Sequence, residues 1–448
     1  MTDLRIAPQS SPLRGSVPVP SDKSITHRAL LFAAIAEGRS VIWASKMGED
    51  NRATLAALRA LGVAAEEETD RITLSGGGLY GLSEPAGELD CGNSGTTMRL
   101  LAGLLAAQRF RSVLVGDASL SRRPMGRIAK PLRLRGARIE GRADPRKIGE
   151  ITAPLEVGPL PAPHVLSGIS VDLPIPSAQV KSALLLSGLY SEGPTVVAEP
   201  TISRDHTERM LSALGVPLER VGPVVSLGSG HWDGKLEAFE LRSPGDLSAA
   251  AFVAVAAALV PESEVEIRDV GMNPTRTGFV DGLRAMGGAI ELVPEGTRLG
   301  EPVGRVRAAH HPLLATTIAG ELVARSIDEI PILCALAARA QGVTRVHDAA
   351  ELRVKESDRI AAMVRVLRAF GVECEERPDG LTIEGRPEAP LRAADVDSEG
   401  DHRIAMTSAI LGLLGDGPSR VRNADPIATS FPRFVGTLRA LGARVEVC

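Results

Sequence analysis

The sequence predicts an α/β fold built from six copies of one unit, arranged as two lobes of three copies each. Three observations support this prediction. A phrase that ends a helix occurs six times, strand-like segments follow most of its copies, and the copies are almost evenly spaced along the 448 residues. A chain of this length is also expected to form two or three domains.

The recurring phrase has a leucine or methionine near its start and a glycine near its end. Each copy follows an amphipathic helical run, and glycine is the residue that most readily adopts the left-handed conformation that stops a helix. Segments of alternating pattern, such as 289–293 and 443–447, come next and predict strands. The glycines lie roughly 70 to 85 residues apart, which is the spacing of a structural repeat. The six copies are Leu58–Val63, Leu132–Ala137, Met210–Val216, Leu283–Gly288, Leu367–Val372 and Leu438–Ala443.

The division between the lobes is predicted at Leu241–Ser248, where a Pro-Gly turn precedes a new capped helix. Residues 243–248 resemble residues 19–24, so both segments are expected to cross from one lobe to the other. A site at this boundary would lie in a cleft between the lobes. The first lobe would then comprise residues 21–243, and the second lobe residues 1–20 and 244–448.

The segment Pro18–Arg28 is a candidate anion-binding site. Ser24 and Arg28 are four residues apart and share a face of the predicted helix, as do Lys23 and His27. Free backbone N–H groups at a helix start also favour an anion. The alternative is a capped surface helix whose charges are solvated.

Five further segments place cations or small polar residues in loops or at predicted helix starts. Arginine suits bidentate binding of a carboxylate or phosphate, although ordinary caps and a salt-bridged exposed helix are the alternatives. The segment Ser326–Leu333 adds two acids beside an apolar run, where a carboxylate can act as a base or as an N-cap. Together these features predict a small polyanion held between two lobes. The five segments are Asp90–Arg99, Gly116–Met125, Ser177–Ser182, Glu351–Arg359 and Asp401–Met406.

Composition argues against several other classes of protein. A net charge of −4 and an aromatic content of 3% do not favour nucleic-acid binding. The longest apolar run, Ala249–Val260, is too short to cross a membrane. Four scattered cysteines and an N-terminus without an apolar signal core predict a cytoplasmic protein without zinc or disulfides. Gly76–Gly81 matches GxGxxG, but no helix is predicted after it, and the His310–Pro312 segment lacks a third metal ligand.

Five motifs together make the chain resemble the 5-enolpyruvylshikimate-3-phosphate synthases. The resemblance covers nearly the whole chain, with the motifs in the same order. It implies the enolpyruvyl transferase fold, in which each of two similar lobes is an inside-out α/β barrel of three repeats and a two-strand hinge joins them. The motifs are Asp22–Arg28, Gly92–Thr96, Arg123–Gly126, Arg353–Arg359 and Asp401–Arg403.

The resemblance also implies a reaction. The enolpyruvyl group of phosphoenolpyruvate would pass to the 5-hydroxyl of shikimate 3-phosphate through a tetrahedral intermediate, with release of phosphate, on the shikimate pathway to chorismate and the aromatic amino acids. No metal or organic cofactor is implied. The two substrates are the expected partners, glyphosate is an expected inhibitor, and a monomer is expected.

Site residues are carried over from the motifs in three sets. For catalysis, Lys355 and Glu356 are candidates to protonate the enol methylene and Asp328 to take the proton of the hydroxyl, while Lys23 completes the set. Shikimate 3-phosphate would be bound by Lys23, Ser24, Arg28, Ser177, Gln179, Arg204, Asp328 and Lys355. Phosphoenolpyruvate would be bound by Lys23, Gly95, Arg123, Gln179, Arg359 and Arg403.

Three positions depart from patterns seen in some members of the family. Ala178 replaces a second serine, Thr429 replaces a lysine, and Glu351 stands where asparagine occurs. These changes indicate a divergent, class II-like branch with weaker phosphoenolpyruvate binding.

The sequence disfavours two alternative functions. A UDP-N-acetylglucosamine enolpyruvyl transferase typically has Lys-Asn where this chain has Lys23-Ser24, and a cysteine in the loop where Ser119–Pro124 has none. A non-catalytic anion-binding repeat protein is disfavoured because aromatic residues are few and the net charge is negative.

Overall fold

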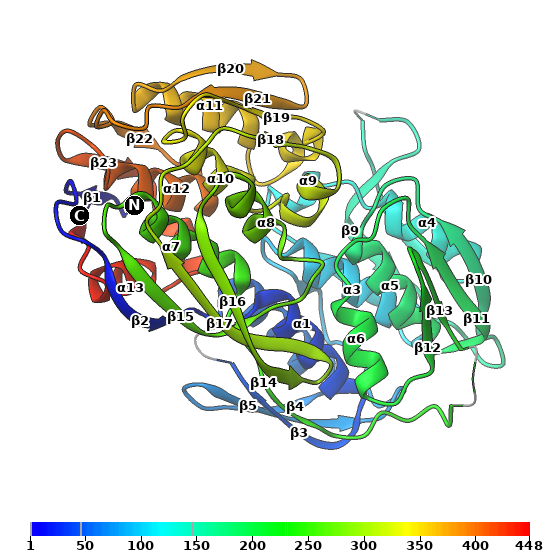
Figure 1. The fold of residues 1–448 in the computed structure, drawn as a ribbon. Coiled ribbons are helices and arrows are strands. Elements are labelled where there is room, and N and C mark those ends of the chain that lie inside the picture. Colours follow the sequence, from blue (N-terminus) through cyan, green and yellow to red (C-terminus); the bar gives the residue numbers. More distant parts are fainter. Residues whose placement is uncertain (1, 45–46, 146, 229, 231) are drawn as a thin grey trace. The chain divides into compact units, whose positions relative to one another are not determined.

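The computed structural model describes the chain except for residues 1, 45–46, 146, 229 and 231. The described residues separate into two compact units, and each contains both helices and sheets (Figure 1). The N-terminal unit comprises residues 23–243 and 298–301, and the C-terminal unit comprises residues 1–22, 244–297 and 302–448. Each unit has its own buried hydrophobic cluster.

The described strands form six four-stranded sheets, three in each unit, with one common arrangement. In each of the strand orders given next, the first two strands are parallel to each other, and the second and third strands are antiparallel. In the N-terminal unit the orders are β14 (Glu240–Arg242), β3 (Glu37–Trp43), β5 (Arg71–Gly77), β4 (Ala64–Glu67); β6 (Leu89–Asp90), β7 (Ser112–Val115), β9 (Ile151–Val157), β8 (Ile139–Ala143); and β10 (Leu166–Asp172), β11 (Ser191–Ala198), β13 (Val224–Leu227), β12 (Leu218–Val221). In the C-terminal unit they are β2 (Arg14–Pro18), β15 (Glu264–Gly271), β17 (Glu301–Ala309), β16 (Ala289–Arg298); β18 (Thr317–Ile318), β19 (Val343–Val346), β21 (Gly380–Glu384), β20 (Glu373–Arg377); and β22 (Asp395–Asp397), β23 (Ser419–Arg422), β1 (Leu4–Ile6), β24 (Val445–Val447).

Strands β2 and β14 exchange places between the repeats. Strand β2 precedes helix α1 (Lys23–Ile35) along the chain but pairs with β15, whereas β14 precedes helix α7 (Leu247–Leu259) but pairs with β3. The segments that follow the two strands are hydrogen-bonded to each other, from Asp22 N to Pro244 O at 2.7 Å and from Asp246 N to Pro20 O at 2.8 Å. The segments 19–24 and 243–248, which resemble each other in sequence, are therefore also hydrogen-bonded to each other in the structure.

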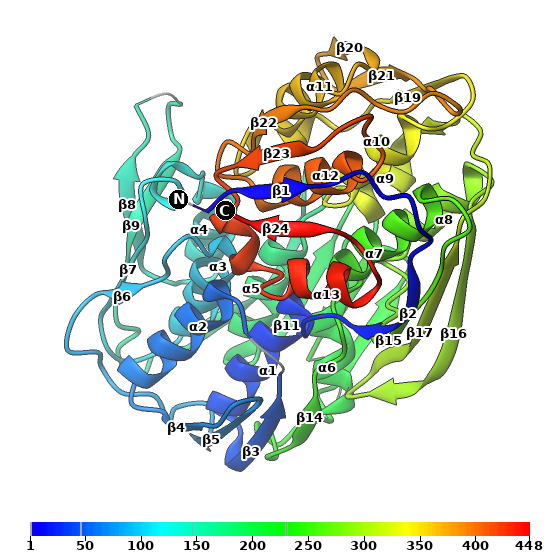
Figure 2. The ribbon, with the colours of Figure 1, turned by 90° about the vertical axis from the view of Figure 1, so that its left-hand side faces the viewer.

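The N-terminal strand completes the last of the six sheets. Strand β1 lies between β23 and β24, antiparallel to both, and Figure 2 shows it in blue between these two strands of the C-terminal end. The first residues of the chain are thus a structural part of its final repeat.

Six helices are buried on nearly all sides and fill the interior of the units. Every residue of α7, α10 and α12 is buried, because apolar or small residues cover these helices all round, apart from His402 and Arg403 in the first turn of α12. Even so, no described helix is long and apolar enough to cross a membrane. The inner helices are α1, α3 (Gly95–Leu105) and α5 (Ala178–Gly188) in the N-terminal unit, and α7, α10 (Ile330–Ala337) and α12 (His402–Gly412) in the C-terminal unit.

The outer helices end in the recurring phrase. All six of its glycines have a positive φ, from +77° at Gly371 to +102° at Gly136. The residue after each glycine donates its N–H to the carbonyl five residues earlier, as from Val63 to Leu58 at 3.1 Å, which is the Schellman arrangement. The predicted six-fold repeat is therefore confirmed. These helices are α2 (Glu49–Ala60), α4 (Gly126–Leu134), α6 (His206–Ala213), α8 (Gly278–Ala285), α11 (Arg359–Ala369) and α13 (Phe434–Ala440), and α9 (Gly320–Ser326) is an additional short helix.

The segment 351–359 does not form the single salt-bridged helix that was one alternative for such a charged segment. A 3₁₀ turn covers Ala350–Val354, Lys355 is extended, and α11 begins only at Arg359. The start is set by Asp358, whose carboxylate accepts a hydrogen bond from Ala361 N at 3.0 Å. Two further 3₁₀ turns cover Leu120–Arg122 and Asp425–Thr429.

Candidate active site

The first turn of α1 is held against the start of α2. The ammonium of Lys23 lies 2.9 Å from the Asp50 carboxylate, and Asn51 Nδ2 donates to the Lys23 carbonyl at 3.0 Å. The Lys23 side chain keeps 28% of its surface exposed. It is therefore positioned by protein contacts and can still reach a ligand.

The predicted ligand Arg28 is deeply buried and ties three helices together. Its guanidinium donates to Thr207 Oγ1 and to Ser182 Oγ, both at 2.7 Å, and to the carbonyl of Ser24 at 2.9 Å. These partners lie on α6, α5 and α1. Arg28 thus fixes the backbone of Ser24, its predicted co-ligand.

Two guanidinium groups approach the backbone at the start of α3. Ser94 caps this helix by accepting from Thr97 N at 3.1 Å. A Cβ atom on Gly95 would lie 2.9 Å from an Nη of Arg99 and 3.3 Å from an Nη of Arg123. The sequence placed Arg99 in the candidate segment Asp90–Arg99 but not among the substrate ligands, although its place one helical turn after Gly95 was a usable signal.

Side-chain amides connect these arginines to neighbouring helix starts. Arg99 donates to Gln179 Oε1 at 2.6 Å, and Gln179 Nε2 donates to Thr96 Oγ1 at 2.9 Å. Arg123 donates to Asn93 Oδ1 at 2.6 Å. The predicted phosphoenolpyruvate ligands Gln179 and Arg123 are therefore hydrogen-bonded to Thr96 and Asn93, which lie within two residues of Gly95.

The remaining predicted ligands of this unit flank α5 and α6. Ser177 caps α5 by accepting from Val180 N at 3.4 Å. Arg204 is half-buried in the segment just before α6. The sequence-predicted residues of this unit thus lie at the starts of the inner helices α1, α3 and α5 and in the segments before α4 and α6.

A buried chain of polar groups underlies the starts of α1 and α3. His27 Nδ1 lies 2.7 Å from Thr54 Oγ1, which lies 2.7 Å from Thr97 Oγ1, and Thr97 in turn donates to Ser94 Oγ at 2.8 Å. Burial lowers the pKa of His27 to about 3, opposed by the nearby Asp50 charge. The imidazole is therefore neutral in the folded protein at neutral pH.

This histidine should make the protein sensitive to mild acid. Below pH 6.5 the unfolded chain takes up a proton at His27 and the folded chain does not. The free energy of unfolding therefore decreases as the pH is lowered, until the folded pKa near 3 is reached. Between pH 7 and pH 5 the loss from this residue is expected to be about 2 kcal/mol. Denaturant unfolding at both pH values should show a correspondingly smaller loss for His27→Asn. Equal losses in the two proteins would contradict the assignment.

In the C-terminal unit, Asp328 lies among three cations. One carboxylate oxygen is 3.4 Å from an Nη of Arg359 and 3.9 Å from the Lys355 ammonium, and the other is 3.9 Å from an Nη of Arg403. Arg403 also donates to the Asp328 carbonyl at 2.7 Å. Glu356 lies 2.6 Å from Arg359. The structure therefore brings together all five residues predicted for this unit.

Arg359 is the buried centre of this cluster. Only 1% of its side chain is exposed, and its Nε donates to Asp401 at 2.8 Å. Burial alone would lower the pKa of Arg359, but the charges of Glu356, Asp401 and Asp328 raise it above its usual value. Burial likewise favours the neutral form of Asp401, yet Arg359 keeps the pKa of that carboxyl below its usual value. Both groups are charged, and Asp401 also caps α12 by accepting from Arg403 N at 2.9 Å.

A second buried arginine, Arg276, connects this cluster to the segments 19–24 and 243–248. Arg276 lies 3.4 Å from Asp22, 3.3 Å from Asp246 and 3.8 Å from Glu329, and it also donates to the hydroxyl of Ser248. Burial alone would lower the pKa of Arg276, but these carboxylates raise it above its usual value. Sequence reasoning missed Arg276, since it lies alone in an unremarkable loop whose neighbours are brought together only by folding.

The two groups of residues suit different chemical tasks. Cations and hydroxyls prevail at the helix starts of the N-terminal unit, which favours anion binding. In the C-terminal unit the partly exposed carboxylates of Asp328 and Glu356 lie beside cations, an arrangement that can move a proton next to a bound anion. No three His, Cys, Asp or Glu side chains within the described part of the chain are arranged to hold a metal ion.

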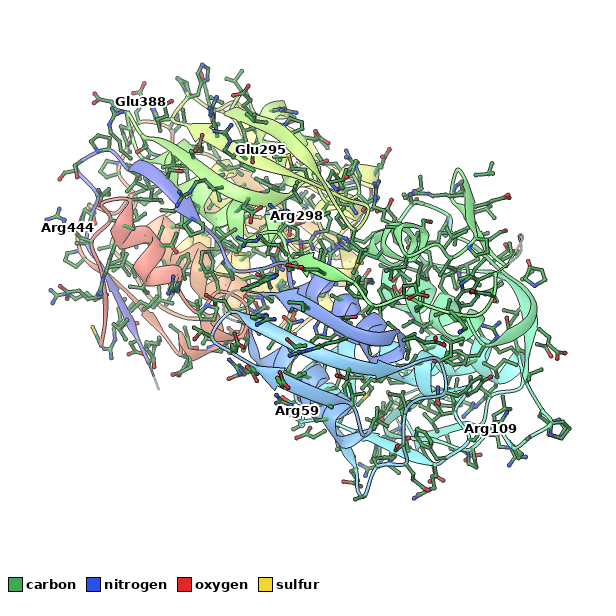
Figure 3. The ribbon with its side chains drawn as sticks, turned by 90° about the horizontal axis from the view of Figure 1, so that it is seen from below. Arg59, Arg109, Glu295, Arg298, Glu388 and Arg444 are labelled. Atoms are coloured by element: carbon green, nitrogen blue, oxygen red, sulfur yellow. The ribbon has the colours of Figure 1, made fainter. Side chains whose placement is uncertain are left out.

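Other charged and hollow regions of the described surface do not involve these residues. A pocket of about 450 Å³ in the N-terminal unit is lined by residues such as Glu84, Arg111 and Glu156. Charged side chains such as Arg59 and Arg109, labelled in Figure 3, are exposed rather than buried. The residues at the helix starts are more buried, since only 1% of the Arg359 side chain is exposed, against 56% for Arg111.

Comparison with known proteins identifies relatives over nearly the whole chain. The family model described as EPSP synthase (3-phosphoshikimate 1-carboxyvinyltransferase) matches residues 8–438. The 3-phosphoshikimate 1-carboxyvinyltransferase of Geobacter sp. (strain M21) is 49% identical over 438 residues, covering 98% of this chain and 99% of the relative. The protein of the same name from Synechococcus sp. (strain RCC307) is 48% identical over 437 residues, covering 96% and 97%.

Solved structures show the same architecture. The EPSP synthase from Acinetobacter baumannii is similar with a TM-score of 0.88 and 41% identity, covering 100% of both chains. The enolpyruvyl transferase NikO from Streptomyces tendae has a TM-score of 0.76 at 18% identity, covering 100% of this chain and 99% of NikO, and this similarity concerns the fold. The predicted enolpyruvyl transferase fold is therefore confirmed.

Proposed function

This chain belongs to the EPSP synthase family, and we propose that the residues at the helix starts of the N-terminal unit, together with the cluster around Asp328 and Arg359, perform the reaction of this family. The reaction transfers the enolpyruvyl group of phosphoenolpyruvate to the 5-hydroxyl of shikimate 3-phosphate. The reaction is a step of the shikimate pathway to the aromatic amino acids. The observation that carries the assignment is the full-length match, in which 49% identity extends over 98% of the chain.

Shikimate 3-phosphate is proposed to bind mainly at the starts of α1, α5 and α6. Lys23 supplies a partly exposed ammonium beside the backbone of Ser24, which Arg28 holds in place. The proposed ligands of this substrate are Lys23, Ser24, Arg28, Ser177, Gln179 and Arg204 from the N-terminal unit, and Asp328 and Lys355 from the C-terminal unit.

Phosphoenolpyruvate is proposed to bind where guanidinium groups meet exposed backbone. The absence of a side chain on Gly95 lets Arg99 and Arg123 approach the start of α3, so a small polyanion can contact both cations and free N–H groups. The proposed ligands of this substrate are Lys23, Gly95, Arg123 and Gln179 from the N-terminal unit, and Arg359 and Arg403 from the C-terminal unit.

Proton transfers are proposed for the acids of the C-terminal unit. Asp328 takes the proton of the 5-hydroxyl, and Glu356 or Lys355 delivers a proton to the methylene carbon of phosphoenolpyruvate. When phosphate departs, a proton leaves the resulting methyl group again and the enol double bond is restored. The surrounding cations, with Lys23, stabilise the charge of the tetrahedral intermediate and of the departing phosphate. The neighbouring cations lie 3.4 to 3.9 Å from the Asp328 carboxylate, and 17% of this side chain is exposed. These contacts support the proposed role of Asp328 as the base, because the cations orient the carboxylate while part of it stays accessible.

Glyphosate is proposed as an inhibitor that competes with phosphoenolpyruvate, and Gly95 should govern its affinity. A methyl group at this position would fall 2.9 Å from Arg99, so the guanidinium must shift. Gly95→Ala is expected to raise the KM for phosphoenolpyruvate and to raise the inhibition constant for glyphosate at least as much. Gly436→Ala is the control, since a Cβ there meets nothing within 4 Å. Unchanged values for Gly95→Ala would remove Gly95 from the phosphoenolpyruvate subsite.

Phosphate release from phosphoenolpyruvate tests the overall reaction. Shikimate 3-phosphate and UDP-N-acetylglucosamine are offered separately to the folded protein, and release is expected only with shikimate 3-phosphate. Release only with the sugar nucleotide would favour the alternative enolpyruvyl transferase. Absence of release with both would favour a non-catalytic anion-binding protein.

A further inference from the structure

A buried ion-pair cluster is centred on Lys181 in the first turn of α5. The ammonium of Lys181 lies 2.6 Å from Glu199 and 2.8 Å from Glu208, and at most 5% of any of these three side chains is exposed. Glu199 immediately follows β11, and Glu208 is on α6. The cluster therefore connects the end of β11 with α5, which carries the proposed shikimate 3-phosphate ligand Gln179, and with α6, which begins two residues after the proposed ligand Arg204.

The carboxylate of Glu199 makes further contacts on the side of the proposed site. One oxygen accepts from Ser177 N at 3.0 Å and from Ser203 Oγ at 2.6 Å. The other accepts from Ser203 N at 3.2 Å as well as from Lys181 at 2.6 Å. A single buried carboxylate thus holds the cap residue of α5 and the residue before Arg204.

Glu208 provides an internal comparison for these contacts. It pairs with the same ammonium and is buried to a similar extent, with 5% of its side chain exposed. No hydrogen bond connects it to Ser177 or Ser203 among the described residues. A purely structural role for the cluster would make the two glutamates comparable, whereas only Glu199 contacts the backbone beside the proposed ligands.

We propose that Glu199 is a positioning residue for shikimate 3-phosphate, which acts by holding Ser177 and the Ser203–Arg204 segment in register. This inference rests on the proposed function. Lys181 fixes the carboxylate, and the carboxylate in turn fixes two segments that are 26 residues apart in sequence, from Ser177 to Ser203. Displacement of a ligand by about 1 Å can cost up to roughly 100-fold in reactivity, so this support is expected to affect substrate binding strongly.

Matched substitutions separate positioning from structural support. Glu199→Gln and Glu208→Gln each replace one of the two glutamates beside Lys181 with an amide of the same size. Glu199→Gln is expected to raise the KM for shikimate 3-phosphate roughly 10-fold or more while changing the KM for phosphoenolpyruvate less than about 3-fold. Glu208→Gln is expected to leave both values within about 2-fold of the unmodified protein. Titration calorimetry with shikimate 3-phosphate alone should show the same order of dissociation constants.

Several outcomes would overturn the proposal. They are an unchanged KM for shikimate 3-phosphate in Glu199→Gln, an equal rise in both variants, and an equal rise for both substrates. Where Glu199→Gln does not fold, Glu199→Asp retains the charge but withdraws the carboxylate by about 1.5 Å, and an unchanged KM there would equally overturn it. The proposed function fails separately, since the unmodified protein would then release no phosphate with shikimate 3-phosphate.

Discussion

Replacing Asp328 with asparagine is expected to lower kcat by roughly 10²- to 10⁴-fold, the usual effect of losing an acid–base group. Asparagine retains the size of the side chain but cannot accept the proton of the 5-hydroxyl. The carbonyl of residue 328, which accepts from Arg403 at 2.7 Å, is unaffected, so the cluster should keep its geometry. Initial rates of phosphate release at saturating levels of both substrates measure the effect.

An exposed aspartate of the same unit serves as the control for this prediction. Asp281 is paired with Arg325 at 2.7 Å and keeps 41% of its side chain exposed. Asp281→Asn should leave kcat within about 2-fold, because exposed ion pairs contribute little. If Asp328→Asn retained near-normal kcat, Asp328 would lose its proposed role as the base.

Replacing Arg359 with methionine is expected to destabilise the protein by about 3–5 kcal/mol, the usual cost of breaking a buried ion pair by removing one partner. Methionine fills much of the same volume but leaves Asp401 uncompensated, and this carboxylate has no exposed surface. The negative charges of Glu356 and Asp328 would also lose their nearest shared cation. Denaturant unfolding at pH 7 measures the change in the free energy of unfolding.

Arg365 provides a control on the same helix. It lies 2.6 Å from Glu399, but 55% of its side chain is exposed. Arg365→Met should therefore cost less than about 1 kcal/mol, because water screens the pair and solvates the remaining charge. Equal destabilisation by the two substitutions would show that the burial of Arg359 does not determine its contribution.

Local patterns in the sequence were sufficient to predict the repeat. The Schellman ends of the six outer helices depend on contacts within about six residues, so a glycine after an amphipathic run is a complete signal. The capped helix predicted after the Pro-Gly turn of residues 241–248 is likewise present as α7. The motifs around Lys23, Gly95 and Arg359 identified the family because they are continuous in sequence.

Long-range contacts decided the rest, and no local pattern encodes them. Arg276 meets Asp22 across 254 positions, and Arg28 meets Thr207 across 179. The exchange of β2 and β14 also depends on pairing with strands far away in the chain. By itself the sequence determined the repeat, the helix ends and the residue types that are proposed to bind the substrates. Only the tertiary structure decided which buried charges hold these residues in place, because such partners are selected by proximity after folding rather than by spacing along the chain.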